Sequence, residues 1–240
     1  MKDLKWIRDG YFAHRGLHNK IIPENSLAAF KHAVQNGYHI ELDIRITKDN
    51  KIVVIHDGNL KRLTGCDIIV EESTYSTIKE HSLLDSNECV PLLSNVLSTL
   101  PETTEFLIEL KSSKRNKDLA TTFLELMTHY QHKYAIHSFD PRILHLFKKL
   151  DSTIIRGQIS KVYKGIGSRL LTNLRFNFWA KPDFINYNFD DLPRKQLDKL
   201  KENGMMILSY VARNEKQLAF VKKHYDNAVF EQFEPKKKVV

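Results

Sequence analysis

Charged and apolar side chains alternate in the run IELDIRI at residues 40–46. On a β-strand successive side chains point to opposite faces, so Glu41, Asp43 and Arg45 share one face and the apolar residues share the other. On an exposed antiparallel strand this is ordinary amphipathicity. In a parallel barrel, however, the charged face points into the barrel, where unpaired carboxylates are costly to bury. A compensating cation is then implied.

The same alternation recurs in the run FLIELK at residues 106–111, where Glu109 and Lys111 share the charged face. If this strand lies beside the first one, Glu109 joins Glu41 and Asp43 in a site built of carboxylates. Such a site favours the hard cations Ca²⁺ and Mg²⁺ over zinc. Lys111 can then meet an anion on the other side of the metal. The alternative is a salt-bridged core network of Glu109 with Lys111.

Two further strand-like runs end in residues that suit acid-base and phosphate chemistry. The run YFAHRG at residues 11–16 carries His14 and Arg15, and the run IVVIHD at residues 52–57 carries His56 with Asp57 beside it. Imidazoles suit general acid and base roles because they titrate near neutral pH, and a guanidinium suits phosphate through paired hydrogen bonds. A lone His-Asp pair is more often structural than catalytic.

The elements that position these residues alternate regularly along the chain. Strands are expected at residues 11–14, 39–46, 105–111, 133–137, 153–159, 183–187, 205–211 and 227–231. Segments with a helical period lie between them, the first of which has Asn25 as its candidate N-cap and Asn36-Gly37 as its stop. Eight β/α units in succession predict a TIM-type (β/α)8 barrel, with the active site at the carboxyl ends of the strands.

Two stretches interrupt this alternation. Residues 51–56 are expected to form an extra strand, hairpinned onto strand 39–46 and followed by a long polar connection, which together make a short insertion after the second strand. Residues 161–181 mix basic and aromatic side chains. For this stretch we expect one amphipathic barrel helix, and the alternative is a surface for an anionic or lipid substrate.

Composition limits the class of protein. The 240 residues include 37 Lys and Arg against 29 Asp and Glu, and the resulting net charge of +8 favours an anionic partner, whether nucleic acid, membrane surface or phosphorylated substrate. The two cysteines, Cys66 and Cys89, form no metal or redox motif. No apolar run approaches the ~18 residues of a membrane span, and no linker divides the chain. We expect one cytoplasmic domain over residues 1–240.

Five short motifs, in this order, resemble those of the glycerophosphodiester phosphodiesterase family. They are His14-Arg15-Gly16, Pro23-Glu24-Asn25-Ser26, Glu41-Leu42-Asp43, Val54-Ile55-His56-Asp57 and Glu109-Leu110-Lys111. Connecting segments such as TKDN at 47–50, VPL at 90–92 and SFD at 138–140 extend the resemblance over nearly the whole chain. Each motif is common by chance, but five in order are not.

The resemblance implies a barrel hydrolase that cleaves glycerophosphodiesters to glycerol 3-phosphate and an alcohol. By matching motif, Glu41, Asp43 and Glu109 would hold one divalent cation, Mg²⁺ or Ca²⁺, His14 and His56 would be the general acid and base, and Arg15 and Lys111 would bind the phosphate. Tyr210 replaces a tryptophan that the family commonly has, and Glu231 stands where a Thr-Asp pair is usual. These departures affect the pocket wall and therefore the choice of alcohol.

Other functions stay open at this point. The same site in another enzyme would act on lysophospholipids or other phosphodiesters at a membrane surface. A nonenzymatic nucleic-acid binder is disfavoured because the sequence carries no nucleic-acid motif. The sequence leaves undecided the head group, the metal, the oligomeric state, which histidine is the base, and whether water attacks directly or a cyclic phosphate forms.

Overall fold

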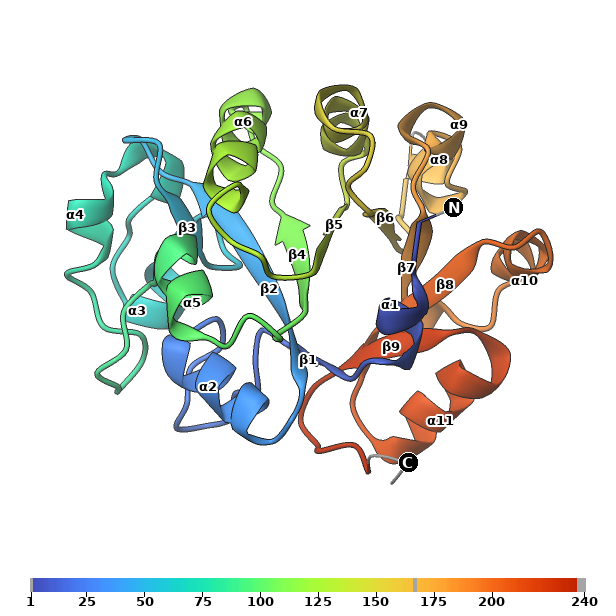
Figure 1. Cartoon of the computed structure of the whole chain (residues 1–240), viewed down its shortest axis with the longest axis horizontal. Coiled ribbons are helices and arrows are strands. Elements are labelled where there is room, and N and C mark those ends of the chain that lie inside the picture. Colours follow the sequence, from blue (N-terminus) through green and yellow to red (C-terminus); the bar gives the residue numbers. More distant parts are fainter. Residues whose placement is uncertain (1, 166–167, 237–240) are drawn as a thin grey trace. The chain divides into compact units, whose positions relative to one another are not determined.

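The computed structural model describes residues 2–165 and 168–236. They divide into two compact units, which are treated separately below. The site unit is Ala13–Tyr134, and the flanking unit consists of the described residues before and after it. Figure 1 labels the elements of both. The single domain expected from the sequence stays a prediction.

The site unit contains most of the predicted site. Its strands are β1 (Phe12–His14, which begins one residue before the unit), β2 (His39–Ile46), β3 (Ile52–Val54) and β4 (Phe106–Leu110). Its helices are α2 (Leu27–Gln35), α3 (Lys61–Thr64), η1 (Val70–Glu72), α4 (Tyr75–Ile78), α5 (Leu93–Thr99) and α6 (Asn116–Met127). All four strands lie within three residues of the positions expected from the alternation of apolar residues.

Strand β2 is the centre of this unit's sheet. It pairs in parallel with β4, and the register places Asp43 directly opposite Glu109. Its carboxyl-terminal end pairs antiparallel with β3, where Ile44 lies opposite Val54. Both the neighbouring third strand and the extra hairpin strand expected from the sequence are therefore confirmed.

Strand β3 and the segment that follows it share a small apolar core. Eight of their side chains are buried against one another, namely Val53, Ile55, Leu60, Leu63, Val70, Ile78, Leu83 and Val90. This packing gives α3, η1 and α4 fixed positions although each is only one turn long. The expected short insertion is thus an ordered cap and not an open loop.

The start of α2 differs from the prediction. Ser26 is the N-cap, and its Oγ accepts a hydrogen bond from the backbone N–H of Ala29 at 3.1 Å. Asn25 lies one residue earlier with a left-handed backbone, at φ 56°. The N-cap role predicted for Asn25 is therefore wrong, because two residues with good capping propensity are adjacent and only one can occupy the position.

The flanking unit supplies the remaining strands. They are β5 (Tyr134–Ser138, which begins in the site unit), β6 (Arg156–Ser160), β7 (Phe184–Asn188), β8 (Met206–Ala212) and β9 (Asn227–Phe230). Each pairs in parallel with the next. The helices are α1 (Lys5–Asp9), α7 (Pro141–Leu150), α8 (Arg169–Thr172), α9 (Asn177–Ala180), η3 (Phe189–Asp191), α10 (Lys195–Glu202) and α11 (Glu215–His224). Their alternation with the strands matches the predicted β/α order.

The connection between β6 and β7 also differs from the prediction. In place of one amphipathic helix over residues 161–181, the structure has the two single-turn helices α8 and α9. Leu174 and Lys181 adopt positive φ angles of 55° and 47°, which an uninterrupted α-helix excludes. Residues 166 and 167 of the predicted helix lie outside the described residues.

Two smaller expectations can be compared with the structure. Cys66 and Cys89 are both free thiols. Across residues 2–165 and 168–236, every helix is too short or too polar to cross a lipid bilayer.

Candidate active site

Three buried carboxylates meet in the site unit. One oxygen from each of Glu41, Asp43 and Glu109 lies within 4.8 Å of the others. Glu41 and Asp43 project from the same face of β2, and the register of β4 brings Glu109 beside Asp43. All three side chains are at most about a tenth exposed. Oxygen donors gathered at this distance and depth match the ligand set of a hard divalent cation.

Two cations flank these carboxylates. The Lys111 ammonium donates a hydrogen bond to Glu109 Oε1 at 2.6 Å and forms an ion pair with Asp43 Oδ1 at 2.8 Å. The Arg15 backbone N–H donates to Glu41 Oε2 at 3.1 Å, and its Nε lies 3.3 Å from Asp43 Oδ2. The salt-bridged network of Glu109 with Lys111 and the carboxylate cluster, two alternatives at the level of sequence, are therefore both present in the same site.

The electrostatics keep the central pair charged. Burial by itself raises the pKa of the Asp43 carboxyl, but the charges of Lys111 and Arg15 outweigh this effect and hold the pKa far below its ordinary value. Burial likewise favours a lower pKa for Lys111, and the neighbouring Asp43 and Glu109 reverse that preference, so the pKa of Lys111 is raised. The site is accordingly ionic at neutral pH.

Asn25 holds Asp43 from the other side. Its side-chain Nδ2 donates to Asp43 Oδ2 at 2.9 Å, and the Asp43 backbone N–H donates to Asn25 Oδ1 at 3.3 Å. The Asn25 backbone N–H also donates to the carbonyl of Arg15 at 2.9 Å. Asn25 therefore fixes both the central carboxylate and the chain that carries Arg15. Capping propensity predicted Asn25 as the N-cap of α2, whereas its contacts make it a partner of Asp43.

His56 has a defined tautomer. Its Nδ1 lies 2.7 Å from Asp57 Oδ1. Burial by itself would raise the pKa of Asp57, but hydrogen bonds from Arg62 and His56 outweigh burial and hold the pKa below its ordinary value. The Asp57 carboxyl is therefore an anion that can only accept hydrogen bonds. Nδ1 must carry the proton, which leaves Nε2 with its lone pair. Burial is also the main reason why the pKa of His56 is lowered, so its neutral form dominates at pH 7.

Arg62 forms hydrogen bonds to both Asp57 and Glu24, and it was not among the residues predicted from the sequence. Its Nε donates to Asp57 Oδ2 at 2.5 Å, and its two terminal nitrogens donate to both carboxylate oxygens of Glu24 at 2.6 and 3.0 Å. Glu24 Oε1 in turn accepts from Arg15 at 2.7 Å. One guanidinium thus links the partner of His56 to the partner of Arg15. The only sequence signal was its place between the apolar residues Leu60 and Leu63.

Arg45 was placed on the charged face of β2, and the structure shows what it does there. Its Nε and one terminal nitrogen donate to the backbone carbonyl of His56 at 3.0 and 2.8 Å. The charged face of β2 therefore carries two acids of the cluster and one arginine that holds the strand end on which His56 lies.

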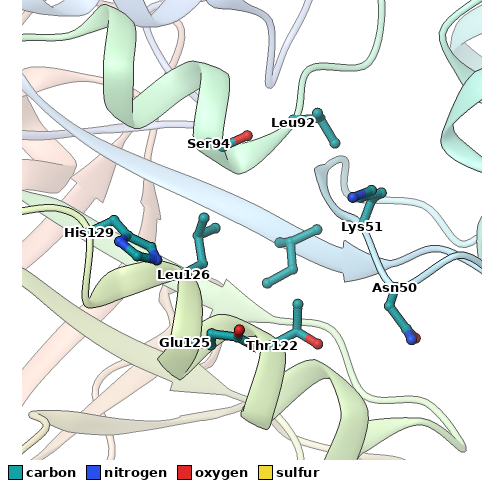
Figure 2. Close-up of a pocket in the computed structure, with 9 residues that line it drawn as sticks. Asn50, Lys51, Leu92, Ser94, Thr122, Glu125, Leu126 and His129 are labelled. Atoms are coloured by element: carbon teal, nitrogen blue, oxygen red, sulfur yellow. The ribbon is translucent and has the colours of Figure 1, made fainter.

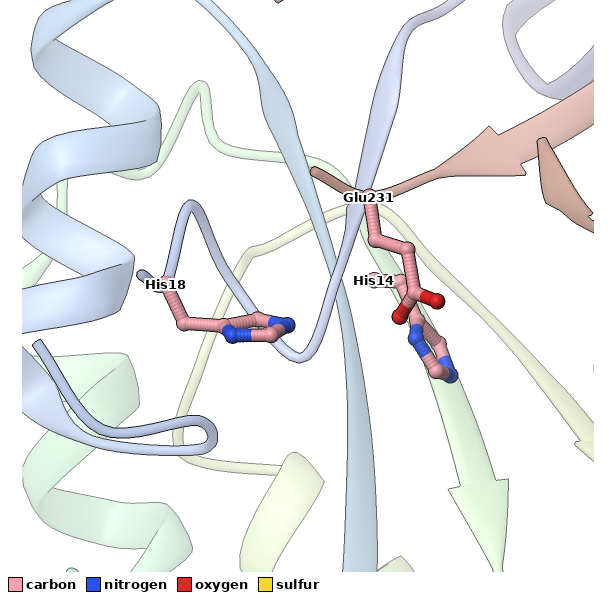
Figure 3. Close-up of side chains that lie close together, drawn as sticks. All are labelled: His14, His18 and Glu231. Atoms are coloured by element: carbon pink, nitrogen blue, oxygen red, sulfur yellow. The ribbon is translucent and has the colours of Figure 1, made fainter. Parts of the chain in front are cut away.

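Figure 3 shows the rings of His14, the last residue of β1, and of His18, which lies in the segment that follows β1. A ring nitrogen of one lies within 4.8 Å of a ring nitrogen of the other. Both side chains are half-buried. His14 is where the sequence predicts a catalytic imidazole, and His18 is a neighbour that the sequence did not single out.

A separate cavity of about 270 Å³ lies elsewhere in the site unit (Figure 2). It is lined by residues of the β2–β3 turn, α5 and α6, including Lys51, Glu125 and His129, and none of the predicted site residues lines it. His132, three residues further along the chain, is buried, with Nε2 2.9 Å from the carbonyl of Leu97.

A parallel α/β fold with a buried carboxylate cluster, flanking cations and imidazoles is typical of enzymes that act on phosphate esters. Comparison with known proteins makes this class specific. The model of the glycerophosphoryl diester phosphodiesterase family matches residues 14–231. The chain belongs to this family, whose members are phosphoric diester hydrolases.

Two curated relatives illustrate the likeness. A glycerophosphodiester phosphodiesterase of Bacillus altitudinis is 37% identical over 151 residues, which is 58% of this chain and 61% of the relative. A lysophospholipase D of Rattus norvegicus is 34% identical over 137 residues, which is 52% of this chain and 42% of the relative. Each match therefore spans less than two thirds of the relative's own length.

A solved structure confirms the fold. A phosphodiesterase of Oleispira antarctica, in complex with the product sn-glycerol-3-phosphate, superposes with a TM-score of 0.82 at 20% identity over 92% of both chains. Together with the order of strands and helices, this likeness confirms the predicted TIM-type (β/α)8 barrel class with a short insertion after the second strand.

Proposed function

We propose that the chain hydrolyses glycerophosphodiesters to glycerol 3-phosphate and an alcohol. The observation that carries this proposal is the buried group of Glu41, Asp43 and Glu109 with Arg15 and Lys111 in direct contact. A purely structural network rarely gathers three carboxylates at this depth, because each buried charge needs compensation. Family membership and the product bound to the Oleispira protein support the substrate class.

One divalent cation, Mg²⁺ or Ca²⁺, fits the three carboxylates, since all of its ligands would be hard oxygen donors. When bound, the cation supplies positive charge to the phosphoryl oxygens. Three carboxylates against Arg15 and Lys111 leave one negative charge when the histidines are neutral. A divalent cation turns this balance to one positive charge, which complements the single negative charge of a phosphodiester.

Arg15 and Lys111 are the proposed phosphate ligands. Both are held by carboxylates of the cluster or by Glu24, so their positions are set before the substrate arrives. Cations that are already oriented stabilise developing charge without reorganising at the moment of reaction. The guanidinium can offer two parallel hydrogen bonds, whereas the ammonium acts as a point charge.

His14 and His56 are the proposed general acid and base. His56 is neutral at pH 7 with Nε2 available, so it is able to take a proton from the attacking oxygen or, after protonation, to give one to the leaving alcohol. His14 takes the complementary role. The attacking group is either water or the neighbouring glycerol hydroxyl, which would form a cyclic phosphate that ³¹P NMR detects during turnover.

The direct test is hydrolysis of glycerophosphocholine and glycerophosphoethanolamine, followed by release of glycerol 3-phosphate. We expect turnover with Mg²⁺ or Ca²⁺, none in excess chelator, and none in Glu41→Gln or His56→Gln, while both variants keep a cooperative thermal unfolding transition. Glu125→Gln, in the separate cavity, is the matched control and should keep full activity. Full activity of either site variant, or of the chelated protein, contradicts the proposal.

A second candidate is the same chemistry on lysophospholipids at a membrane surface. It is favoured by the likeness to the rat lysophospholipase D and by the exposed apolar side chains between β6 and β7. Comparing kcat/KM for glycerophosphocholine and lysophosphatidylcholine distinguishes the two candidate substrates.

The cytoplasmic location and the single domain expected from the sequence are also proposals. Cell fractionation tests the location, and limited proteolysis tests the single domain.

A further inference from the structure

The connection between β6 and β7 is uniformly basic. Residues 161–181 contain five Lys and Arg and no Asp or Glu. All five basic side chains are exposed, namely Lys161, Lys164, Arg169, Arg175 and Lys181. The described part of this stretch, residues 161–165 and 168–181, is called the basic segment below. The segment has no acidic side chain to offset this charge, so its surface attracts anions.

Large apolar side chains are exposed on the same segment. Phe178 is 78% exposed, Leu170 is 51% exposed and Val162 is 43% exposed. Single exposed apolar residues are common, but three within about twenty residues that carry only positive charge are typical of a segment that binds membrane surfaces. The exposed side chains of the segment are therefore both apolar and cationic.

The segment is anchored, so this exposure is a property of its fold. The Tyr163 backbone N–H donates to Thr172 Oγ1 at 3.0 Å, and Ser160 Oγ donates to the carbonyl of Leu171 at 3.0 Å. Leu174 packs into the core of the flanking unit with Tyr187. These contacts hold the segment against the flanking unit, and the side chains of Leu170 and Phe178 are exposed to solvent.

A backbone hydrogen bond brings an apolar and a cationic residue of the segment together. The Arg175 N–H donates to the carbonyl of Leu170 at 2.9 Å, so the two residues lie side by side across the turn between α8 and α9. A side chain that inserts among acyl chains and one that meets a lipid phosphate thus start from adjacent backbone positions.

We propose that the basic segment binds the surface of a bilayer that contains anionic phospholipids. Phe178 and Leu170 would enter the interface between head groups and acyl chains, and Arg175 with the lysines of the segment would meet the lipid phosphates. Aliphatic side chains such as Leu170 and Val162 have no stacking role on nucleobases. The ring of Trp179 is already stacked on His145 at 3.8 Å. These features favour a bilayer over a single-stranded nucleic acid.

The test is flotation of the full chain with vesicles of phosphatidylcholine and phosphatidylglycerol, compared with vesicles of phosphatidylcholine alone. We expect binding to the anionic vesicles that weakens with salt. Phe178→Ser should lower the partition coefficient about tenfold, since an inserted phenylalanine contributes about 1.4 kcal/mol or more. Arg175→Gln should lower it about fivefold.

Matched controls lie on α7, which precedes β6 while the basic segment follows it. Leu150→Ser removes an apolar side chain that is 45% exposed, and Lys149→Gln removes an exposed charge. Both should bind vesicles like the wild type. Equal vesicle binding by Phe178→Ser and the wild type overturns the proposal. So does binding of a single-stranded oligonucleotide without binding of vesicles.

This inference does not depend on the proposed hydrolysis. Vesicle binding is measured without substrate, and Phe178→Ser should hydrolyse water-soluble glycerophosphocholine at the wild-type rate. An inactive protein that floats with anionic vesicles refutes the hydrolase alone, and an active protein that does not float refutes the membrane surface alone.

Discussion

Replacing Lys111 with methionine should make the stability of the protein depend on a divalent cation. The ammonium lies 2.6 Å from Glu109 and 2.8 Å from Asp43, and all three groups are buried. Methionine keeps most of the volume and removes the charge, which leaves two carboxylates without their shared counterion. Breaking a buried ion pair in this way costs about 3–5 kcal/mol of unfolding free energy.

The magnitude follows from these contacts. For a chain of this length, such a loss lowers Tm by roughly 6–20 °C when no divalent cation is present. A cation held by the three carboxylates restores the missing positive charge. It should also bind at least about tenfold more tightly in the variant, because a positive charge adjacent to its ligands has been removed. At a hundred times the dissociation constant, bound cation contributes about 2.7 kcal/mol of stability.

The assay is thermal unfolding of the wild type and of Lys111→Met, each in chelator and at several concentrations of Mg²⁺ or Ca²⁺, with isothermal calorimetry for the affinities. We expect the variant to gain more in Tm than the wild type and yet to hydrolyse glycerophosphocholine far more slowly. Lys61→Met is the control, since that side chain is 71% exposed. A variant whose Tm rises no more than that of the wild type would show that the cation does not replace the charge of Lys111 at the carboxylates.

Three further outcomes follow from the contacts around the site. Asn25→Ala should lower the free energy of unfolding, measured in urea, by about 1–3 kcal/mol, because the buried carboxylate of Asp43 loses its amide donor. Unchanged stability would show that Asn25 does not stabilise the buried Asp43. Arg62→Gln should lower kcat/KM about tenfold with less than about 1 kcal/mol lost in stability, since the guanidinium is half exposed. Arg62→Lys should not restore activity, because an ammonium lacks the planar set of donors that reaches Asp57 and both oxygens of Glu24 at once. The NMR titration midpoint of His56 should lie below 6.5 and fall further in Asp57→Asn, because burial lowers the pKa of His56 and the Asp57 hydrogen bond raises it; the acid limb of kcat/KM should then move to lower pH, and a midpoint above 6.5 would contradict the assignment.

The sign of the His56 effect on stability is also defined. Its folded-state pKa is lowered, so the unfolded chain binds the proton more readily than the folded one. This group therefore costs no stability above about pH 6.5 and destabilises the fold as the pH falls below that value.

The carboxylate cluster was predictable because it depends on two simple periodicities. Alternation along β2 placed Glu41 and Asp43 on one face, and the βα order made β4 the parallel neighbour that carries Glu109. No knowledge of loops was needed. The same alternation placed Arg45 on that face, although its role in holding the His56 carbonyl required coordinates.

Contacts between distant loops were not predictable. Asn25 and Ser26 have similar capping propensity, and only the position of Asp43 decides which of them turns toward the site. Arg62 lies in the insertion, and its partners Glu24 and Asp57 come from two other connections. Residues 161–181 were predicted to form one helix. The left-handed backbone of Leu174, however, separates α8 from α9.

Glu41, Asp43 and Glu109 are proposed to hold a divalent cation beside the phosphate of the substrate. The most direct test is a crystal structure with Mn²⁺ and glycerol 3-phosphate, in which anomalous scattering locates the metal. We predict one anomalous peak bonded to all three carboxylates, with the phosphate in contact with Arg15 and Lys111. A phosphate bound at these two cations with no peak among the carboxylates would contradict it.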